Sequence, residues 1–137
     1  MTETPFGLST IGQILVPVRD AERATAFYRD ALGLPFLFAF PHMAFFDADG
    51  VRLYLSEPES PGFRGKATLY FRVPDIGVAV DALEARGVVF HERPSVVHRD
   101  PAYELWMCFT KDPDGNNIGL MCEVPTGPSV GEGAPAA

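Results

Sequence analysis

Residues 105–122 read LWMCFTKDPDGNNIGLMC, with apolar runs on either side of Asp112-Pro-Asp-Gly-Asn116. Proline fixes φ in this pentapeptide, and glycine and asparagine tolerate the left-handed region, so the five residues favour a reversal of the chain. The stretch therefore predicts a β-hairpin. A weaker copy lies at residues 43–56, where Asp47-Ala-Asp-Gly50 separates two apolar runs.

The two hairpins divide the chain into matching halves. In each half a strand leads to an aspartate that begins a helix, Asp20 or Asp75, and a glycine ends that helix, Gly33 or Gly87. Corresponding residues lie about 55 positions apart, which indicates an internal repeat. We expect an α+β fold of two βαβββ repeats that form a curled mixed sheet with a central cup, with the helices on the outer face.

The boundaries of these parts follow from composition. We expect a loose N-terminal arm at 1–10, a first module at 11–57, a linker at 58–65, a second module at 66–123 and a disordered tail at 124–137. The linker consists of turn-forming residues throughout, and the tail is dominated by small residues and proline, which bury too little apolar surface to become ordered. Within the second module, the sequence predicts a strand at 88–91 and then a longer loop containing Pro94 and Pro101.

Composition narrows the range of partners. The net charge of −7 argues against nucleic acid and against an anionic membrane, and it is compatible with a cationic ligand, although solubility is the simpler explanation. Aromatic residues make up 12% of the chain and include eleven phenylalanines, more than a core of this size requires. We interpret the excess as an indication of an aromatic-lined pocket.

The sequence also predicts a cytoplasmic location. The first five residues have neither a basic segment nor an apolar one, so no signal peptide is visible, and the apolar runs are too short to span a bilayer. Cys108 and Cys122 lie inside apolar runs on the two arms of one hairpin. They are expected to be buried free thiols in a reducing compartment.

The spacing Asp20-x-x-x-Ala-x-x-Phe27-Tyr28-x-x-x-Leu-Gly33, together with Asp112-Pro-Asp-Gly-Asn116, resembles the vicinal oxygen chelate superfamily over residues 11–123. That superfamily includes glyoxalase I, extradiol dioxygenases, fosfomycin-modifying enzymes and bleomycin-resistance binding proteins. The resemblance is specific for the fold and says little about activity, because both enzymes and pure binders share this scaffold.

The resemblance implies where a metal would be held in the cup. Catalytic members use His, Gln or Glu from the first and last strand of each half. Matching to the motif of these members places Gln13, Tyr54, Thr68 and Gly119 at those positions, and strand alternation turns all four toward the cup. A phenol and an aliphatic hydroxyl are poor ligands at neutral pH and glycine has no side chain, so we expect neither a metal nor another cofactor there.

The remaining cup positions favour an aromatic ligand. Tyr54 and Tyr70 face the cup by alternation, and Phe36, Phe38 and Phe40 share one face of their strand. Trp106 borders the cup, although its strand is apolar on both faces and alternation leaves its direction open. Phe45 and Phe109 are expected to fill the core instead. The predicted ligand-binding residues are Gln13, Phe38, Phe40, Tyr54, Thr68, Tyr70 and Trp106.

Two functions are favoured over a third, a scaffold or regulatory domain that binds protein, for which the sequence offers only the general versatility of the fold. The first is sequestration of a small aromatic, antibiotic-like molecule without a metal or catalytic residue, as in the drug-binding branch of the superfamily. The alternative is a lyase, isomerase or dioxygenase that uses a relocated metal or an acid–base pair of His98 and Glu104 across the long loop. By analogy with the superfamily, the chain is expected to form a homodimer.

Overall fold

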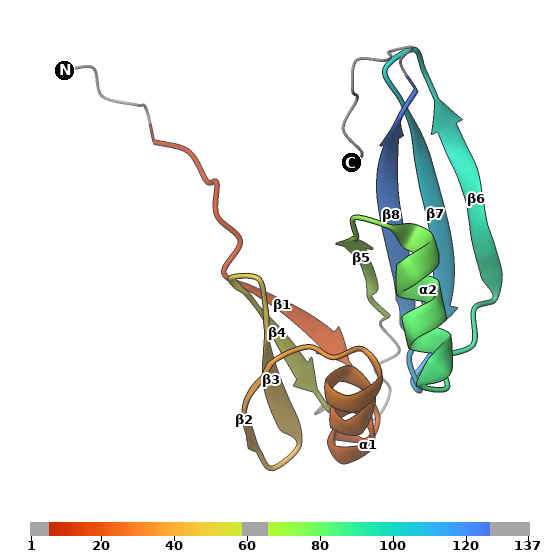
Figure 1. Cartoon of the computed structure of the whole chain (residues 1–137). Coiled ribbons are helices and arrows are strands. Elements are labelled where there is room, and N and C mark those ends of the chain that lie inside the picture. The colour runs from red at the N-terminus through yellow and green to blue at the C-terminus, as the bar shows by residue number, and fades with distance from the viewer. Residues whose placement is uncertain (1–5, 59–65, 127–137) are drawn as a thin grey trace.

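The computed structural model describes residues 6–58 and 66–126, which form two modules of one helix and one four-stranded sheet each (Figure 1). The first module contains β1 (Gln13–Pro17), α1 (Ala21–Ala26), a π-helical turn η1 (Phe27–Ala31), β2 (Phe36–Phe40), β3 (Met43–Ala48) and β4 (Val51–Ser56). The second contains β5 (Thr68–Arg72), α2 (Ile76–Ala85), β6 (Glu92–Arg99), β7 (Tyr103–Lys111) and β8 (Asn117–Pro125).

Both sheets have the same topology. Sheet A has the order β1-β4-β3-β2 and sheet B the order β5-β8-β7-β6. In each, the first strand pairs in parallel with the last, and the other neighbours are antiparallel. The predicted α+β fold of two βαβββ repeats is therefore confirmed.

The helix signals in the sequence act as predicted. The carboxylates of Asp20 and Asp75 each accept a hydrogen bond of 3.1 Å from the backbone N–H three residues on, which satisfies a donor that a helix start leaves unpaired. Gly33 and Gly87 follow the helices with φ of 79° and 92°, a region that costs other residues energy.

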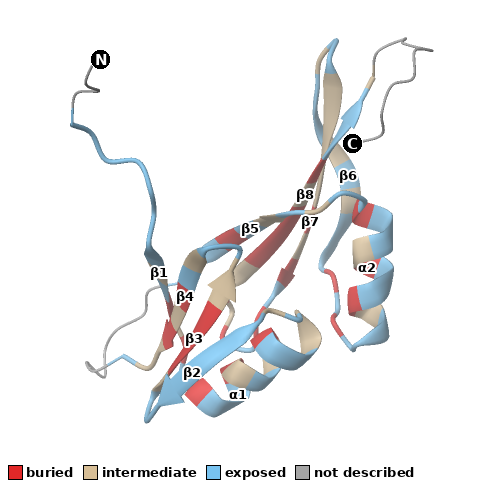
Figure 2. Ribbon diagram, turned by 60° about the vertical axis from the view of Figure 1, so that its left-hand side comes forward, coloured by how far each residue is buried: buried red, intermediate tan, exposed pale blue. Residues whose placement is uncertain are grey.

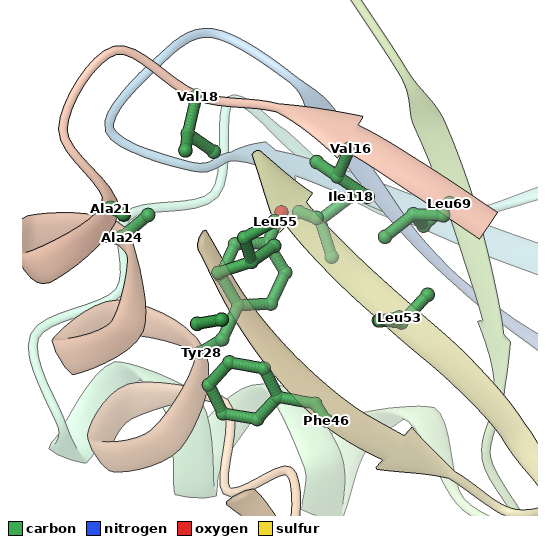
Figure 3. Packing of buried hydrophobic residues seen from close by; sticks show 11 residues of the cluster. Val16, Val18, Ala21, Ala24, Tyr28, Phe46, Leu53, Leu55, Leu69 and Ile118 are labelled. Atoms are coloured by element: carbon green, nitrogen blue, oxygen red, sulfur yellow. The ribbon is translucent and has the colours of Figure 1, made fainter. Parts of the chain in front are cut away.

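The alternation predicted for the strands is confirmed in the core. Val16, Leu53 and Leu55 are buried on the side of sheet A that faces α1, where they pack around Tyr28 and Phe46 (Figure 3). In sheet B, Leu120 and Cys122 are buried on the side that faces α2. The residues between them on each strand therefore lie on the opposite face, which we call the inner face of each sheet.

The Asp112–Asn116 turn joins the two modules. Asn116, which is fully buried, donates to the carbonyl of Pro17 and to Asp112, each at 2.8 Å, and accepts from the N–H of Ala67 at 2.7 Å. The hydroxyl of Tyr28 donates to Asp112 at 2.8 Å. A turn of the second module is thus hydrogen-bonded to β1 and to the helix of the first.

Asp114 adds charge to the same contact. One carboxylate oxygen accepts from the backbone N–H of Arg19 at 2.8 Å and from the guanidinium groups of Arg19 and Arg23 at 3.2 and 3.1 Å. The other oxygen is buried without a partner among the described residues. Packing continues across the modules, since Phe27 and Leu32 contact the core of the second module, and Figure 2 shows both helices on one side of the molecule.

The region between α2 and the second hairpin differs from the prediction. Residues 88–91 form no strand, and the expected loop instead contains β6, which includes Pro94. Proline removes a backbone donor, which an edge strand tolerates, and β6 is the edge of sheet B with shifts in register near Pro94 and Val97. These irregularities obscure the alternation from which a strand is predicted.

The expected arm, linker and tail fall partly outside the described residues. Residues 6–10 of the arm are exposed and have no regular secondary structure, whereas residues 1–5, most of the linker (59–65) and residues 127–137 lie outside the described ranges. Strand β8 extends to Pro125, so the first two residues assigned to the tail belong to sheet B.

Both cysteines are free and buried, as predicted. Burial raises the pKa of the Cys108 thiol to about 11, so the thiolate is disfavoured at neutral pH. Within residues 6–58 and 66–126, neither helix has the length and apolar character needed to cross a membrane.

Candidate functional site

The inner face of sheet A carries a cluster of aromatic rings. Phe45 on β3 stacks on Tyr54 of β4 with ring centroids 4.7 Å apart and planes parallel to within 1°. Phe38 lies 4.8 Å from Phe45, and Phe40 completes the group edge-on. Phe45 is buried, as expected, and it lies on the inner face of sheet A. Cross-strand pairs of this kind form when side chains are opposite each other in register, as Phe45 and Tyr54 are.

A cation covers the same rings. The guanidinium carbon of Arg52 lies 5.6 Å from the centroid of the Phe38 ring and 5.8 Å from that of Phe45. A guanidinium at this distance is attracted to the face of an aromatic ring. The inner face of sheet A therefore presents rings, an exposed positive charge and the exposed amide of Gln13 at the start of β1.

Phe36 is not part of this cluster. A bulge between Phe36 and Phe38 shifts the register of β2 against β3, so that Phe36 lies on the α1 side and packs edge-on against Phe46 with centroids 5.5 Å apart. The prediction that Phe36, Phe38 and Phe40 share one face is therefore wrong for Phe36. A bulge adds a residue to one strand and so reverses the alternation on one side of it.

The inner face of sheet B contains two adjacent rows of side chains. Pairing across β5, β8 and β7 places Thr68, Asn117 and Lys111 in one row, and Tyr70, Gly119 and Phe109 in the next. All of these except Gly119 line a pocket of about 310 Å³, together with His91, Glu92 and Thr110. Phe109, expected in the core, thus lines a pocket.

Gly119 is essential to the shape of this pocket. A Cβ atom at that position would lie 2.8 Å from the Phe109 ring and 3.0 Å from the Tyr70 ring. The two rings, whose centroids are 5.8 Å apart, therefore occupy the space that a side chain at 119 would need. The glycine lets them approach the strand and form the floor of the pocket.

The four positions matched to metal ligands do not fit a divalent cation. Tyr54 is stacked on Phe45, the space at Gly119 is filled by rings, and Thr68 accepts a hydrogen bond from Asn117 at 3.3 Å. Only Gln13 offers an ordinary ligand oxygen, and one neutral amide cannot hold such an ion. Among the described residues, no three His, Cys, Asp or Glu side chains come together as a possible metal site.

Trp106 lies on the other side of sheet B. It is opposite Cys122 in the β7–β8 register and packs against the core that α2 covers. Its indole N–H donates to Glu104 at 3.2 Å. The structure thus resolves the direction that alternation left open, and it places Trp106 away from the inner face.

The predicted pair of His98 and Glu104 is replaced by two other pairs. His98 lies 3.2 Å from Asp100, and Glu104 accepts from Arg99 at 2.8 Å. His42 lies closer to a carboxylate than His98 does, since Nδ1 of His42 is 2.8 Å from Glu57. The backbone N–H of Ala21 donates to the other oxygen of Glu57 at 2.9 Å, and these two bonds hold the pKa of Glu57 below its usual range.

The His42–Glu57 pair borders a groove of about 780 Å³ between the start of α1 and the β2–β3 hairpin. Apolar side chains form much of its wall, among them Phe36, Phe40 and Met43. No local pattern in the sequence points to this pair, because 15 positions separate the two residues and only the pairing of β3 with β4 brings them together.

Comparison with known proteins identifies relatives of the fold. Residues 10–120 match the family model described as the Glyoxalase/Bleomycin resistance protein/Dioxygenase superfamily. No curated protein sequence matches the chain.

Several solved structures share the fold at low sequence identity. Lactoylglutathione lyase from Agrobacterium tumefaciens is 22% identical with a TM-score of 0.70, covering 85% of this chain and 95% of its own. A superfamily member from Sphaerobacter thermophilus is 24% identical with a TM-score of 0.68, covering 85% and 98%. A third, from Alicyclobacillus acidocaldarius, is 18% identical with a TM-score of 0.68, covering 83% and 91%.

Proposed function

The chain belongs to the glyoxalase/bleomycin resistance protein/dioxygenase superfamily, and from this membership we propose that it is a cytoplasmic protein that sequesters a small aromatic, antibiotic-like molecule without a bound metal. The ligand would lie on the inner faces of the two sheets. The aromatic cluster of Phe38, Phe40, Phe45 and Tyr54 carries this proposal. The three phenylalanine rings contact one another and Tyr54 stacks on Phe45, which forms a surface suited to a flat apolar molecule.

The chemistry at the four matched positions supports binding over metal-dependent catalysis. They offer one amide, one phenol, one hydroxyl and a glycine crowded by two rings. Sequestration requires no catalytic group, so such a site is sufficient for it. Orientation would come from the polar groups at the edges of the rings, Gln13 on β1 and Arg52 on β4.

We further propose that a second copy of the chain completes the site. Leu15, Phe40 and Tyr70 are 49%, 58% and 53% exposed on the inner faces. A ring that loses about 100 Å² of apolar surface on one open face gains only about 2.5 kcal/mol, whereas micromolar affinity requires about 8 kcal/mol. A homodimer in which each inner face is covered by the partner would supply the missing wall.

Titration calorimetry against a panel of aromatic antibiotics tests the binding proposal. We expect at least one dissociation constant below about 100 μM, weakened about tenfold or more in Phe40→Ala. Val78→Ala, which shortens an exposed side chain on α2 away from the inner faces, is the control and should bind as the wild type does. Failure of the whole panel to bind would overturn the proposal.

Light scattering across a concentration series tests the homodimer separately. A dimer mass at micromolar concentration is expected. A monomer mass at every concentration, with and without ligand, would exclude a second copy of the chain as part of the site.

The His42–Glu57 pair supports a second candidate function, an acid–base enzyme. Glu57 would hold Nδ1–H of His42 and leave Nε2 as the base, with substrate in the adjoining groove. His42→Gln would then abolish turnover while leaving binding on the inner faces unchanged. A relocated metal would appear in elemental analysis of protein purified without chelators, as stoichiometric nickel, zinc, iron or manganese.

A further inference from the structure

The sheet B pocket has a chemical polarity that the proposed binding function leaves unspecified. Its polar row consists of Lys111, Asn117 and Thr68, linked by hydrogen bonds of 2.6 Å from the Lys111 ammonium to Asn117 Oδ1 and 3.3 Å from Asn117 Nδ2 to Thr68 Oγ1. The direction of these bonds determines which kind of ligand atom the pocket can receive.

Each bond in the row has one possible direction. An ammonium can only donate, so Asn117 must turn its carbonyl oxygen toward Lys111. Its NH₂ group then faces Thr68, and the Thr68 hydroxyl oxygen must accept. The hydroxyl hydrogen of Thr68, two hydrogens of the ammonium and the second amide hydrogen are left for other partners. The row therefore offers mainly donors, since its one carbonyl oxygen already accepts from the Lys111 ammonium.

The neighbouring row supplies an aromatic surface at a defined distance. Tyr70 lies two residues after Thr68 on β5 and Phe109 two residues before Lys111 on β7, a separation of about 7 Å along the strands. Glu92 on β6 pairs with Phe109 on β7, so it lies at the opposite end of this row from Tyr70. Its carboxylate would repel an anionic group placed near it, and so would turn that group toward Lys111.

Resting on the proposed binding function, we propose that this pocket selects aromatic ligands bearing a carboxylate, with the ring against Tyr70 and Phe109 and the carboxylate on the donors of Lys111 and Thr68. An arylalkanoate with a two-carbon spacer matches the separation of the two rows. The local donors decide this preference, although the chain as a whole carries a net charge of −7, because salt largely screens exposed charges that are more than about 10 Å away.

Three probes with the same ring and spacer test the proposal in titration calorimetry: 3-phenylpropionate, its isosteric amide 3-phenylpropanamide, and 3-phenylpropylamine. We expect the carboxylate to bind about tenfold more tightly than the amide, and the amine to bind most weakly. Lys111→Met should remove the preference for the carboxylate and leave the affinity for the amide unchanged. Thr68→Val, which leaves the lysine in place, should weaken carboxylate binding about threefold.

Arg99→Met is the matched control, because it removes one exposed positive charge from the same sheet at a site remote from the pocket in the β6–β7 register. It should keep the full preference. Equal affinity for carboxylate and amide, or a preference retained in Lys111→Met, would overturn this inference and leave the binding function in place. Failure of all three probes and of the antibiotic panel would overturn both.

Discussion

The two hairpin turns have similar sequences, but the first is exposed to solvent and the second is largely buried. In the first module, Asp47 accepts from the N–H of Gly50 at 3.0 Å, and the turn projects into solvent. In the second, Asp112 accepts from the backbone N–H groups of Asp114 and Asn116 at 2.8 Å and also holds Tyr28 of the other module. The same turn chemistry therefore stabilises only its own hairpin in the first module. In the second module it also joins the two modules.

The largest expected difference between the turns concerns Asn116. Replacing it with alanine leaves the carbonyl of Pro17 and the N–H of Ala67 buried without their partner. We expect a loss of about 3–5 kcal/mol in the free energy of unfolding, against about 0.5–1.5 kcal/mol for Asp47→Ala in the exposed turn. Urea denaturation measures both, and equal losses would mean that the buried turn does not stabilise the contact between modules.

Tyr28→Phe removes one hydrogen bond of the same contact and keeps the ring. Because the hydroxyl is buried and its partner is a carboxylate, the expected loss is about 1–3 kcal/mol. Tyr54→Phe is the control, since its hydroxyl has no hydrogen-bond partner within the described residues, and it should change stability by less than about 0.5 kcal/mol. If Tyr28→Phe leaves the free energy of unfolding unchanged, packing of the ring alone joins the modules at this position.

The same tyrosine makes stability depend on alkaline pH. Burial, and then the charge and hydrogen bond of Asp112, raise the pKa of Tyr28 well above its usual range. The folded state therefore keeps the neutral phenol, while the unfolded chain ionises near pH 10. The stabilisation is complete below that pH and falls above it by about 1.4 kcal/mol per pH unit. Thermal unfolding between pH 8 and 11 should show a steeper loss in the wild type than in Tyr28→Phe, which keeps the smaller contribution of the buried Cys108 thiol; parallel curves would contradict it.

The smallest expected difference concerns the turn glycines. Gly50 and Gly115 have φ of 97° and 88°, so alanine at either position should cost about 1–2 kcal/mol. Only Gly115 has a close neighbour, because the Lys66 side chain lies 3.2 Å from the place that the Cβ of an alanine would take, and that flexible chain can move aside. The two losses should therefore agree within about 0.5 kcal/mol. A much larger loss at Gly115 would show that the backbone conformation of this turn also stabilises the contact between modules.

Local signals in the sequence were sufficient for much of the fold. The capping bonds of Asp20 and Asp75 and the turn glycines involve neighbours within three or four positions, and alternation on β1, β4, β5 and β8 follows from regular strand geometry. Gln13, Tyr54, Thr68 and Tyr70 could be placed on the inner faces for the same reason. Alternation failed where regularity did, at the bulge that turns Phe36 toward α1 and along the irregular edge strand β6.

The sequence by itself determined the repeat, the helix ends and the residue types at the four matched positions, because each depends on neighbours along the chain. Only the tertiary structure decided that Trp106 faces α2, that His42 meets Glu57, and that one of two similar turns joins the modules. Those outcomes depend on which distant segment lies opposite each side chain, and hydrophobic packing and strand register settle that together.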